Sequence, residues 1–296
     1  MKYRSNQAHY HMMLLPGLLL LVVFSIIPMA GIVMAFQDFK IGLGIWRSPW
    51  IGLQNFKYLF ELSDSRVIFY NTIFIAVFKI IGNLLVPLTF AILLNELRGR
   101  FFKRFVQTVV YVPHFLSWVI LSGIIVEMTT TDGLVNQIVK AFGGEPIIFL
   151  ASNQWFPVIL ISSDIWKEFG FGTIIYLAAL TGINPSLYEA AVIDGASRPQ
   201  QIRYITLPLL VPTFILLATL SIGNVLNAGF DQVFNLYNPL VYESGDIIDT
   251  YVYRAGLINA QFGLATAVGL MKSVISFLLI IVSYTLASRF ANYRIF

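Results

Sequence analysis

The sequence contains no cysteine, and only 11% of its 296 residues are charged. Without cysteine the chain has no disulfide, no thiolate metal ligand and no cysteine nucleophile. Soluble domains carry about a quarter charged residues, so charge this sparse does not cover a globular surface of this length. Because 57% of the residues are apolar or aromatic, we expect a lipid bilayer to be the solvent for most of the chain.

Histidines and nucleotide-binding motifs are also scarce. The three histidines, His9, His11 and His114, have no clustered carboxylates beside them in the sequence, and we interpret them as packing or interface residues rather than metal ligands. The Walker A pattern is absent, and no Gly-Lys dipeptide occurs. We therefore expect no cofactor and no ATPase activity in this chain. The net charge of +4 is better explained by cytoplasmic Lys and Arg than by nucleic-acid binding.

Long apolar runs are what the sequence has in abundance. A spanning helix needs about 20 predominantly apolar residues. Six stretches qualify: 12–36, 68–95, 105–127, 156–180, 207–230 and 264–289. The first is longer than a signal-peptide core and lacks a small-residue cleavage site, so we interpret it as a span. The prediction is an all-α integral membrane protein with about six transmembrane helices, forming a single domain over residues 1–296, since no internal repeat or linker stands out.

The distribution of Lys and Arg predicts the orientation of these spans. With the N-terminus inside, ten fall in cytoplasmic segments: Lys2, Arg4, Arg98, Arg100, Lys103, Arg104, Arg198, Arg203, Arg289 and Arg294. Six fall outside: Lys40, Arg47, Lys57, Arg66, Lys140 and Arg254. The positive-inside rule therefore predicts that both termini are cytoplasmic.

Three substantial segments are then external: 37–67, 128–155 and 231–263. The first is rich in aromatic residues that suit the headgroup boundary. The second predicts a short helix that Asp132 caps and that Gly143-Gly144 ends. The third is acidic, with Glu243, Asp246 and Asp249 among its residues, and we expect a solvated loop or docking surface there.

A cytoplasmic loop at about 184–206 carries the most informative pattern. Asn184 is a good N-cap, and Pro185 suits the first helical position, where its missing N–H is not needed. Gly195 suits a left-handed C-cap, and Ser197 with Gln200 forms a capping-box pattern that restarts the helix. Pro199 is tolerable at the second helical position. The first helix, of about ten residues, is marginal alone in water, so we expect it to dock against a partner.

Within this loop, Glu189-Ala190-Ala191, two residues, Asp194-Gly195-Ala196 and then Ile205-Thr206-Leu207-Pro208 resemble the EAA signature of permeases from binding-protein-dependent ABC importers. The resemblance implies the type I ABC importer permease fold and a bacterial cytoplasmic (inner) membrane location. It also implies that a coupling helix inserts into the ATPase subunit. By this resemblance Glu189, Ala190, Ala191, Asp194, Gly195 and Ala196 form that contact, and Leu207 and Pro208 lead back into the membrane.

The same resemblance implies the partners. They are an ATPase dimer that binds ATP and Mg, a second and non-identical permease subunit, and an extracytoplasmic sugar-binding protein. Five segments resemble the carbohydrate-importer branch: Lys103–Thr108, Pro113-His114-Phe115, Phe230–Gln232, Asn238–Tyr242 and Asp246–Tyr253. Within that branch the chain is similar to permeases for oligosaccharides of complex polysaccharides, some of which contain uronic acids. The expected substrate is therefore an oligosaccharide.

Polar residues in or near the spans have two interpretations. They are Lys79, Asn83, Asp164, Lys167, Glu168, Asn224, Asn227 and Lys272. An ionisable residue at the bilayer centre costs at least about 2.5 kcal/mol, so each should face a cavity, a partner helix or the interface. In one interpretation Lys79, Asn83, Asn224, Asn227 and Lys272 line the translocation path, and the lysines favour an anionic sugar. In the other, Asp164, Lys167 and Glu168 pair with one another, and the lysines snorkel or serve packing.

Two other classes of protein remain as alternatives. An integral-membrane enzyme of polysaccharide or lipid metabolism needs paired carboxylates at a membrane face, and only the stretch Glu243, Asp246, Asp249 offers them. An ion-coupled secondary transporter should have broken helices and inverted repeats, and the sequence shows no such repeat.

Overall fold

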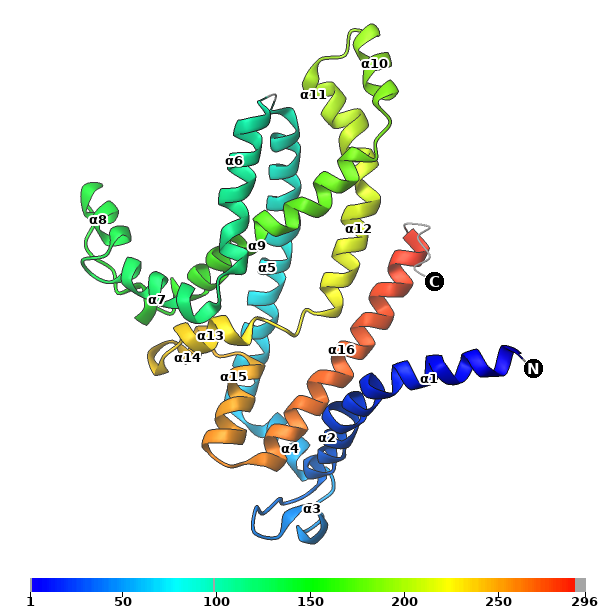
Figure 1. Ribbon diagram of the computed structural model, residues 1–296. Helices are drawn as coiled ribbons and strands as arrows, with labels where there is room; N and C mark the ends of the chain where they lie inside the picture. Colours follow the sequence, from blue (N-terminus) through cyan, green and yellow to red (C-terminus); the bar gives the residue numbers. More distant parts are fainter. Residues whose placement is uncertain (1, 98, 291–296) are drawn as a thin grey trace. The chain divides into compact units, whose positions relative to one another are not determined.

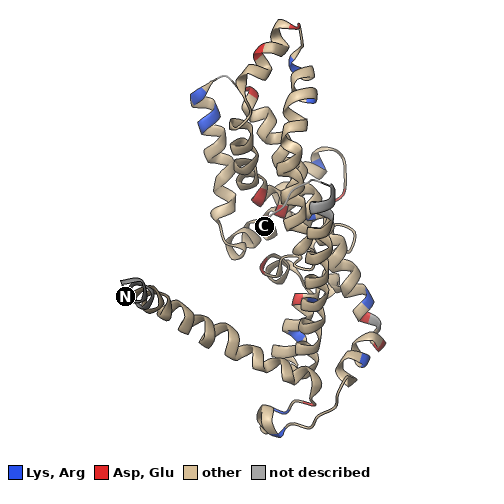
Figure 2. Cartoon of the chain, turned by 90° about the vertical axis from the view of Figure 1, so that its right-hand side faces the viewer, with Lys and Arg blue, Asp and Glu red and all other residues tan. Residues whose placement is uncertain are grey.

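The computed structural model describes residues 2–97 and 99–290, and every regular element among them is helical apart from one bridge between Gln37 and Trp50 (Figure 1). The all-α prediction is confirmed. Arg98 and Arg294, which contribute to the predicted charge bias, lie outside the described residues. Few charged side chains interrupt the helices, and most of the chain is neither acidic nor basic (Figure 2).

The chain divides into two compact units. The first unit comprises the residues up to 62 together with 252–271, and the second comprises 63–251 with the residues from 272 onward. The first unit holds α1 (Lys2–Leu21), α2 (Ile27–Met29), α3 (Gly44–Arg47), α4 (Gln54–Glu61) and the beginning of α16 (Phe262–Phe290), with a π-helical stretch at Val22–Ile26, a 3-10 stretch at Ala30–Phe36 and a π-helical stretch at Arg254–Ile258.

The second unit contains the long helices and the candidate sites. Its α-helices are α5 (Ser63–Glu96), α6 (Arg100–Tyr111), α7 (Trp118–Thr129), α8 (Leu134–Ala141), α9 (Phe156–Thr181), α10 (Pro185–Ile193), α11 (Arg198–Gln201), α12 (Leu207–Gly223), α13 (Phe230–Leu236), α14 (Tyr242–Gly245), most of α15 (Ile248–Tyr253) and the remainder of α16. Short 3-10 turns occupy Val112–Phe115, Phe149–Ala151 and Pro239–Val241, and a π-helical stretch occupies Ile202–Thr206.

Helix α9 packs against α5 and α6 at close range (Figure 1). Glycines make this approach possible: a Cβ at Gly82 of α5 would lie 2.0 Å from Ile165 Cδ1, and a Cβ at Gly170 of α9 would lie 2.1 Å from Val110 O. Small residues let membrane helices come close enough for van der Waals packing to hold them together. The core beside this contact includes the buried residues Phe156 and Leu160 of α9.

Five helical stretches in the described chain are long and apolar enough to cross a membrane: His9–Phe36, Asp64–Glu96, Trp118–Ala141, Arg198–Gly223 and Phe262–Thr285. The sequence predicts six. The predicted span 156–180 corresponds to α9, which has 26 residues but carries three ionisable side chains. The predicted span 105–127 is not one helix, because α6 ends at Tyr111 and α7 begins at Trp118. Pro113, which has no N–H to donate, lies in the turn between them.

Prolines also explain two π-helical stretches. Val22–Ile26 ends two residues before Pro28, and Ile202–Thr206 ends two residues before Pro208. A proline inside a helix donates no hydrogen bond and its ring crowds the carbonyl four residues earlier. An extra residue in the preceding turn relieves this crowding, and single-turn π-bulges of this kind occur within α-helices.

The segment 128–155 forms the predicted short helix, α8, but its cap differs from the prediction. The N-cap is Gly133, and Asp132 pairs with Lys140 at 3.4 Å instead of capping the helix. The buried Asn136 side chain organises the segment by donating to Thr130 O at 2.8 Å and accepting from the Ile147 N–H at 2.8 Å. Gly143, with φ of +81°, ends the helix as expected.

Candidate functional site

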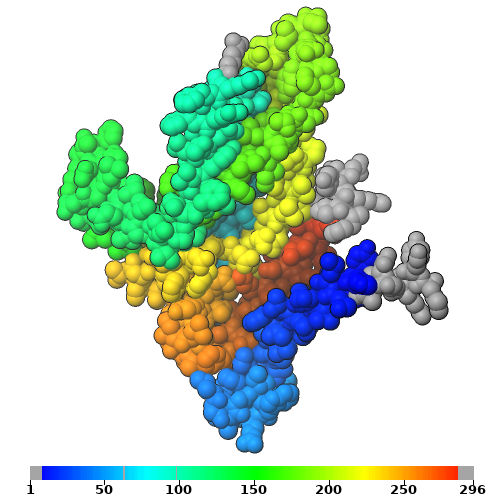
Figure 3. All heavy atoms as spheres, in the orientation of Figure 1, coloured from blue at the N-terminus to red at the C-terminus, as the bar shows by residue number. Residues whose placement is uncertain are grey.

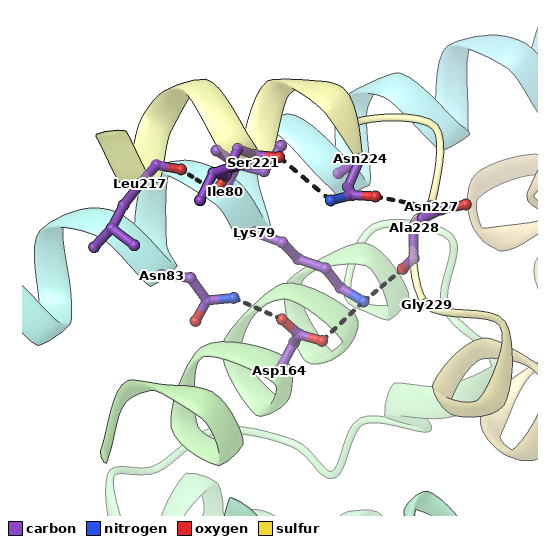
Figure 4. Close-up of a pocket in the computed structure, with 12 residues that line it drawn as sticks. Lys79, Ile80, Asn83, Asp164, Leu217, Ser221, Asn224, Asn227, Ala228 and Gly229 are labelled. Carbon is purple, nitrogen blue, oxygen red and sulfur yellow. Dashed lines mark hydrogen bonds and ion pairs between the residues drawn. The ribbon is translucent and has the colours of Figure 1, made fainter. Parts of the chain in front are cut away.

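A pocket of about 310 Å³, lined by both polar and apolar side chains, lies within the second unit (Figure 4). Helices α5, α9 and α12 and the irregular stretch after α12 supply its walls. Its lining residues are Ala76, Lys79, Ile80, Asn83, Asp164, Leu217, Leu220, Ser221, Asn224, Asn227, Ala228 and Gly229. Four of the five residues that the sequence assigns to the translocation path, Lys79, Asn83, Asn224 and Asn227, thus line one cavity.

Lys79 lies at the floor of this pocket, with 6% of its surface exposed. Its ammonium group donates to Ala228 O at 2.7 Å and to Gln232 Oε1, and it forms an ion pair with Asp164 Oδ1 at 3.3 Å. Gln232 is itself fixed, because its Nε2 donates to Leu160 O and to Ser163 Oγ, each at 2.8 Å. Lys79 therefore does not snorkel, and it joins α5, α9 and the start of α13.

The asparagines complete the polar lining. Asn83 Nδ2 donates to Asp164 Oδ2 at 2.9 Å, so both carboxylate oxygens of Asp164 are engaged. Asn224 Nδ2 donates to Leu220 O at 3.3 Å, and Asn227 Nδ2 donates to Asn224 Oδ1 at 3.4 Å. These contacts hold the stretch that follows α12 with its amide groups along the pocket (Figure 4).

Lys272 is not among the lining residues of this pocket. It pairs with Asp249 Oδ1 at 2.5 Å, and its side chain is 16% exposed. The pair connects α16 to α15 within the second unit. The structure thus separates Lys272 from the four residues that share the pocket.

The three ionisable residues of α9 do not form the closed triad that the second interpretation of the sequence predicts. Lys167 and Glu168 do pair, at 2.9 Å, but Asp164 pairs with Lys79 instead. Glu168 also contacts His114 Nδ1 at 2.7 Å, and the imidazole stacks on Phe171 with ring centroids 4.1 Å apart. His114 therefore has a carboxylate partner that its sequence neighbours do not reveal. The described chain holds no group of three or more His, Asp or Glu side chains that fits a metal ion.

The loop 184–206 has the predicted caps. Asn184 Oδ1 accepts from the Ser186 N–H at 3.0 Å, with Pro185 at the first position of α10. Gly195 has φ of +77°, and the Ala196 N–H returns to Ala191 O at 2.8 Å. The Ser197 N–H donates to Gln200 Oε1 at 2.7 Å in a capping box that starts α11, in which Pro199 is tolerated.

The short helices α10 and α11 and the turn between them form a helical hairpin, which we call the coupling hairpin (residues 184–206) after the role that the sequence predicts for it. Tyr188 Oη and Thr206 Oγ1 are 2.9 Å apart, so a hydrogen bond ties α10 to the base of α12. Gln201 Nε2 donates to Ala196 O at 3.0 Å and closes the turn. The hairpin forms one end of the second unit (yellow-green in Figure 3). Its caps determine where α10 begins and ends.

No residue of α10 is buried within the described chain. Glu189, Ala190, Asp194 and Gly195 are exposed, Ala191 and Ala196 are half-buried, and the apolar Ile193 is 85% exposed. Leu207 and Pro208, at the start of α12, are also exposed. These residues are therefore available for contact with another protein.

The acidic stretch near residue 245 does not assemble carboxylates for catalysis. Asp246 is 2% exposed and accepts from Thr250 Oγ1 at 2.7 Å, Asp249 pairs with Lys272, and Glu243 accepts from Asn153 Nδ2 at 3.4 Å. The expectation of a solvated loop is wrong for Asp246, because short helices α14 and α15 fold this segment against α5: Asn71 Nδ2 donates to Glu243 O at 3.0 Å.

Sequence reasoning missed Ser221 as a lining residue and Gln232 as a support for Lys79. Ser221 Oγ donates to Leu217 O at 2.8 Å one turn before Asn224. The repeat of polar residues at Ser221, Asn224 and Asn227 on an otherwise apolar stretch is a signal that could have found it. Gln232 belongs to the Phe230-Asp231-Gln232 motif, whose role the sequence alone does not explain.

Comparisons with known proteins agree with this architecture. Residues 83–292 match the family described as "Binding-protein-dependent transport system inner membrane component", and the chain belongs to this family. The polygalacturonan/rhamnogalacturonan transport system permease protein YteP of Bacillus subtilis (strain 168) is 42% identical over 98% of this chain and 91% of the relative. The protein LplB of the same organism is 40% identical over 97% of this chain and 90% of the relative.

A solved structure is similar along nearly the whole chain. It is a chain of a bacterial ABC transporter involved in the import of the acidic polysaccharide alginate, with a TM-score of 0.90, 36% identity and 98% of each chain covered. The fold is therefore that of an ABC importer permease, and the chain is an inner membrane component of a binding-protein-dependent transport system.

Proposed function

We propose that this chain is the permease subunit of an ATP-driven importer that carries an oligosaccharide, including uronate-containing ones, across the bacterial cytoplasmic membrane. The observation that carries the proposal is the coupling hairpin, a capped helix of nine residues with no buried residue of its own. The names of the relatives support the substrate class, because polygalacturonan, rhamnogalacturonan and alginate are all polysaccharides.

In this proposal the coupling hairpin docks into an ATPase dimer, which binds ATP and Mg. Glu189, Ala190 and Ala191 make the contact on α10, and Asp194, Gly195 and Ala196 make it at the turn. Leu207 and Pro208 carry the movement into α12. The chain itself performs no catalysis. The carboxylates of the acidic stretch have separate partners, Thr250 for Asp246 and Lys272 for Asp249, and give no support to the alternative of a membrane enzyme.

The remaining partners follow from the same proposal. A second, non-identical permease subunit completes the pathway, and an extracytoplasmic binding protein delivers the sugar on the side opposite the coupling hairpin. A complex of the similar alginate transporter with an alginate pentasaccharide-bound periplasmic protein supports such a partner; the matching chain has a TM-score of 0.89 at 36% identity. Both termini are cytoplasmic in this arrangement.

We further propose that the pocket around Lys79 belongs to the translocation path and that α9 is the sixth span of a single permease domain. The ionisable residues of α9 do not prevent this, because Asp164 and Lys167 are paired inside the second unit. Paired or cavity-facing positions are where charged residues occur in membrane helices. A water-filled transport path supplies the polar surroundings that Asn224 and Asn227 require.

The test is purification of the chain after co-expression with its genomic neighbours, followed by ATPase assays with binding protein and candidate oligosaccharides. The native complex should contain an ATPase whose rate rises when a sugar is supplied. Gly195→Pro should abolish this stimulation, because proline fixes φ near −65° whereas residue 195 requires +77°.

Gly143→Pro is the matched control. Gly143 has a similar φ of +81° but lies at the end of α8, away from the coupling hairpin. It should leave the ATPase bound and stimulated. A chain that purifies without an ATPase, or a stimulation that survives Gly195→Pro, would falsify the coupling assignment and return the secondary-transporter alternative to consideration.

A further inference from the structure

The ammonium group of Lys79 has no donor left for a substrate. An ammonium carries three N–H donors. Three acceptors surround Lys79 Nζ, namely Ala228 O at 2.7 Å, Gln232 Oε1, and Asp164 Oδ1 at 3.3 Å. Two of these acceptors are locked in place by other contacts, because Gln232 is held by α9 and Asp164 accepts from Asn83.

The charge of Lys79 is compensated as well. Asp164 lies on the pocket wall and contributes one negative charge directly beside the ammonium, so the pair adds no net charge to the pocket. Both side chains are largely buried, at 7% and 15% exposure, where solvent screens the pair poorly and the mutual attraction is strong. A sugar carboxylate would therefore have to break this pair to reach the lysine.

The other polar lining groups are neutral. They are the amides of Asn83, Asn224 and Asn227 and the hydroxyl of Ser221. Within the described chain the buried Asn83 Oδ1 has no hydrogen-bond partner, and an unpaired buried acceptor is costly. Hydroxyl groups of a sugar donate to amide and hydroxyl oxygens and accept from amide N–H groups.

We infer that the pocket holds a glycosyl unit through its hydroxyl groups, without selecting for a carboxylate, and that Lys79 is a positioning residue rather than a sugar ligand. Lys79 acts through Ala228 O: it fixes the stretch 224–229 that presents Asn224 and Asn227 to the pocket. This inference rests on the proposed function and deepens it. It replaces the sequence-based expectation that Lys79 favours an anionic sugar.

The experiment compares two probes that differ only in charge: an oligogalacturonide and its fully methyl-esterified form. Their dissociation constants are measured on the purified complex without binding protein, so that only sites in the membrane complex contribute. Three variants are compared with the native chain: Asp164→Asn, Lys79→Met and the double variant. The quantity of interest is the ratio of the two dissociation constants.

The native complex should bind both probes with constants within about threefold of each other. Asp164→Asn unmasks the positive charge and should shift the ratio toward the acid by about tenfold or more, as expected for a unit charge several ångströms away at an effective dielectric constant of about 20. Lys79→Met leaves the Asp164 carboxylate unpaired, so the ratio of dissociation constants should shift toward tighter binding of the ester by a similar factor. The double variant should return to the native ratio, because its net charge is again zero.

A different pattern overturns the inference. If Lys79 binds the sugar carboxylate directly, the native complex prefers the acid by more than about tenfold, and Lys79→Met and the double variant lose this preference equally. Asp164→Asn is nearly isosteric and keeps an oxygen for Asn83, so the native chain and this variant decide the question even where Lys79→Met does not assemble. Binding of neither probe overturns the sugar pocket itself, whereas ATPase coupling through Gly195 still tests the importer function separately.

Discussion

Gly229 offers a direct measurement of how strongly the ammonium of Lys79 is held. Gly229 precedes α13 with φ of +95°, and a Cβ at this position would lie 3.0 Å from Lys79 Nζ. Gly229→Ala therefore does two things. It places an L-residue in left-handed backbone, and it pushes the ammonium away from Ala228 O, which it contacts at 2.7 Å.

Each effect has an expected magnitude. The left-handed conformation costs a non-glycine residue about 1–2 kcal/mol. A hydrogen bond that involves a charged group contributes about 1.5–3 kcal/mol, and a displacement of a few tenths of an ångström loses part of it. The sum is about 2–4 kcal/mol. Gly143→Ala isolates the first effect, because Gly143 has φ of +81° and no heavy atom within 4 Å of the added Cβ.

The assay is the thermal unfolding midpoint of the purified complex for both variants, in the native and in the Lys79→Met background. Gly229→Ala should lower the midpoint more than Gly143→Ala, by about 2–4 °C for each additional kcal/mol. In the Lys79→Met background the two should cost the same, because the clash is gone and only the backbone term remains. Equal losses in the native background would refute the conclusion that Lys79 is held tightly against this loop.

Three further outcomes are expected. Gly170→Ala should destabilise the complex by about 1–3 kcal/mol or more because its Cβ would lie 2.1 Å from a backbone oxygen of α6, whereas Gly123→Ala, with open space around it, should be neutral or slightly stabilising in a melting experiment. Asp249→Asn leaves the partly buried Lys272 without its 2.5 Å partner, so the melting midpoint should fall, and Lys272→Met in the same chain should recover part of the loss. Tyr188→Phe removes the 2.9 Å hydrogen bond at the base of the coupling hairpin, which should cost about 1 kcal/mol locally and appear as faster amide hydrogen exchange in α10 with little change in the global midpoint.

The coupling hairpin could be predicted from the sequence because its determinants are local. Asn184, Pro185, Gly195 and the Ser197–Gln200 pair each act within a few residues of themselves, and all take the predicted positions. Asp132 is the exception: a glycine follows it and caps α8 instead, and the aspartate pairs with a lysine eight residues later.

The pocket was predictable only in part. The cost of a polar group in a bilayer indicates that Lys79, Asn83, Asn224 and Asn227 need a polar environment, and the structure brings them together. The cost of burying a charge in the bilayer does not reveal which residue pairs with Lys79. Asp164 lies 85 positions from Lys79 in the chain, since 164 − 79 = 85, and pairs with it although Lys167 is nearer in sequence. Whether Asp164 pairs with Lys79 or with Lys167 depends on how α5 packs on α9, which the sequence alone does not show.

The span boundaries show a related limit. Counting apolar residues joins α6 and α7 into one stretch, although Pro113 and the Ser117 cap separate them. Counting apolar residues also makes α9 a weaker candidate for a span, because it carries three charged side chains. These side chains find their ion-pair partners only in the folded chain. Hydropathy measures only the composition of a segment. Where a helix ends also depends on residues such as Pro113, which cannot donate a backbone hydrogen bond.

The π-helical turn at Ile202–Thr206 fixes the rotational setting of the coupling hairpin. One residue corresponds to about 100° of rotation and 1.5 Å of rise in an α-helix. Removing a single residue from this turn would convert it to regular α-helix and swing Glu189 around the axis of α12 by about a quarter of a full circle. A complex with a one-residue deletion there would keep every cap of the hairpin and still present the wrong side of α10 to the ATPase that we propose as its partner. The extra residue before Pro208 therefore sets the rotation of the hairpin about the axis of α12.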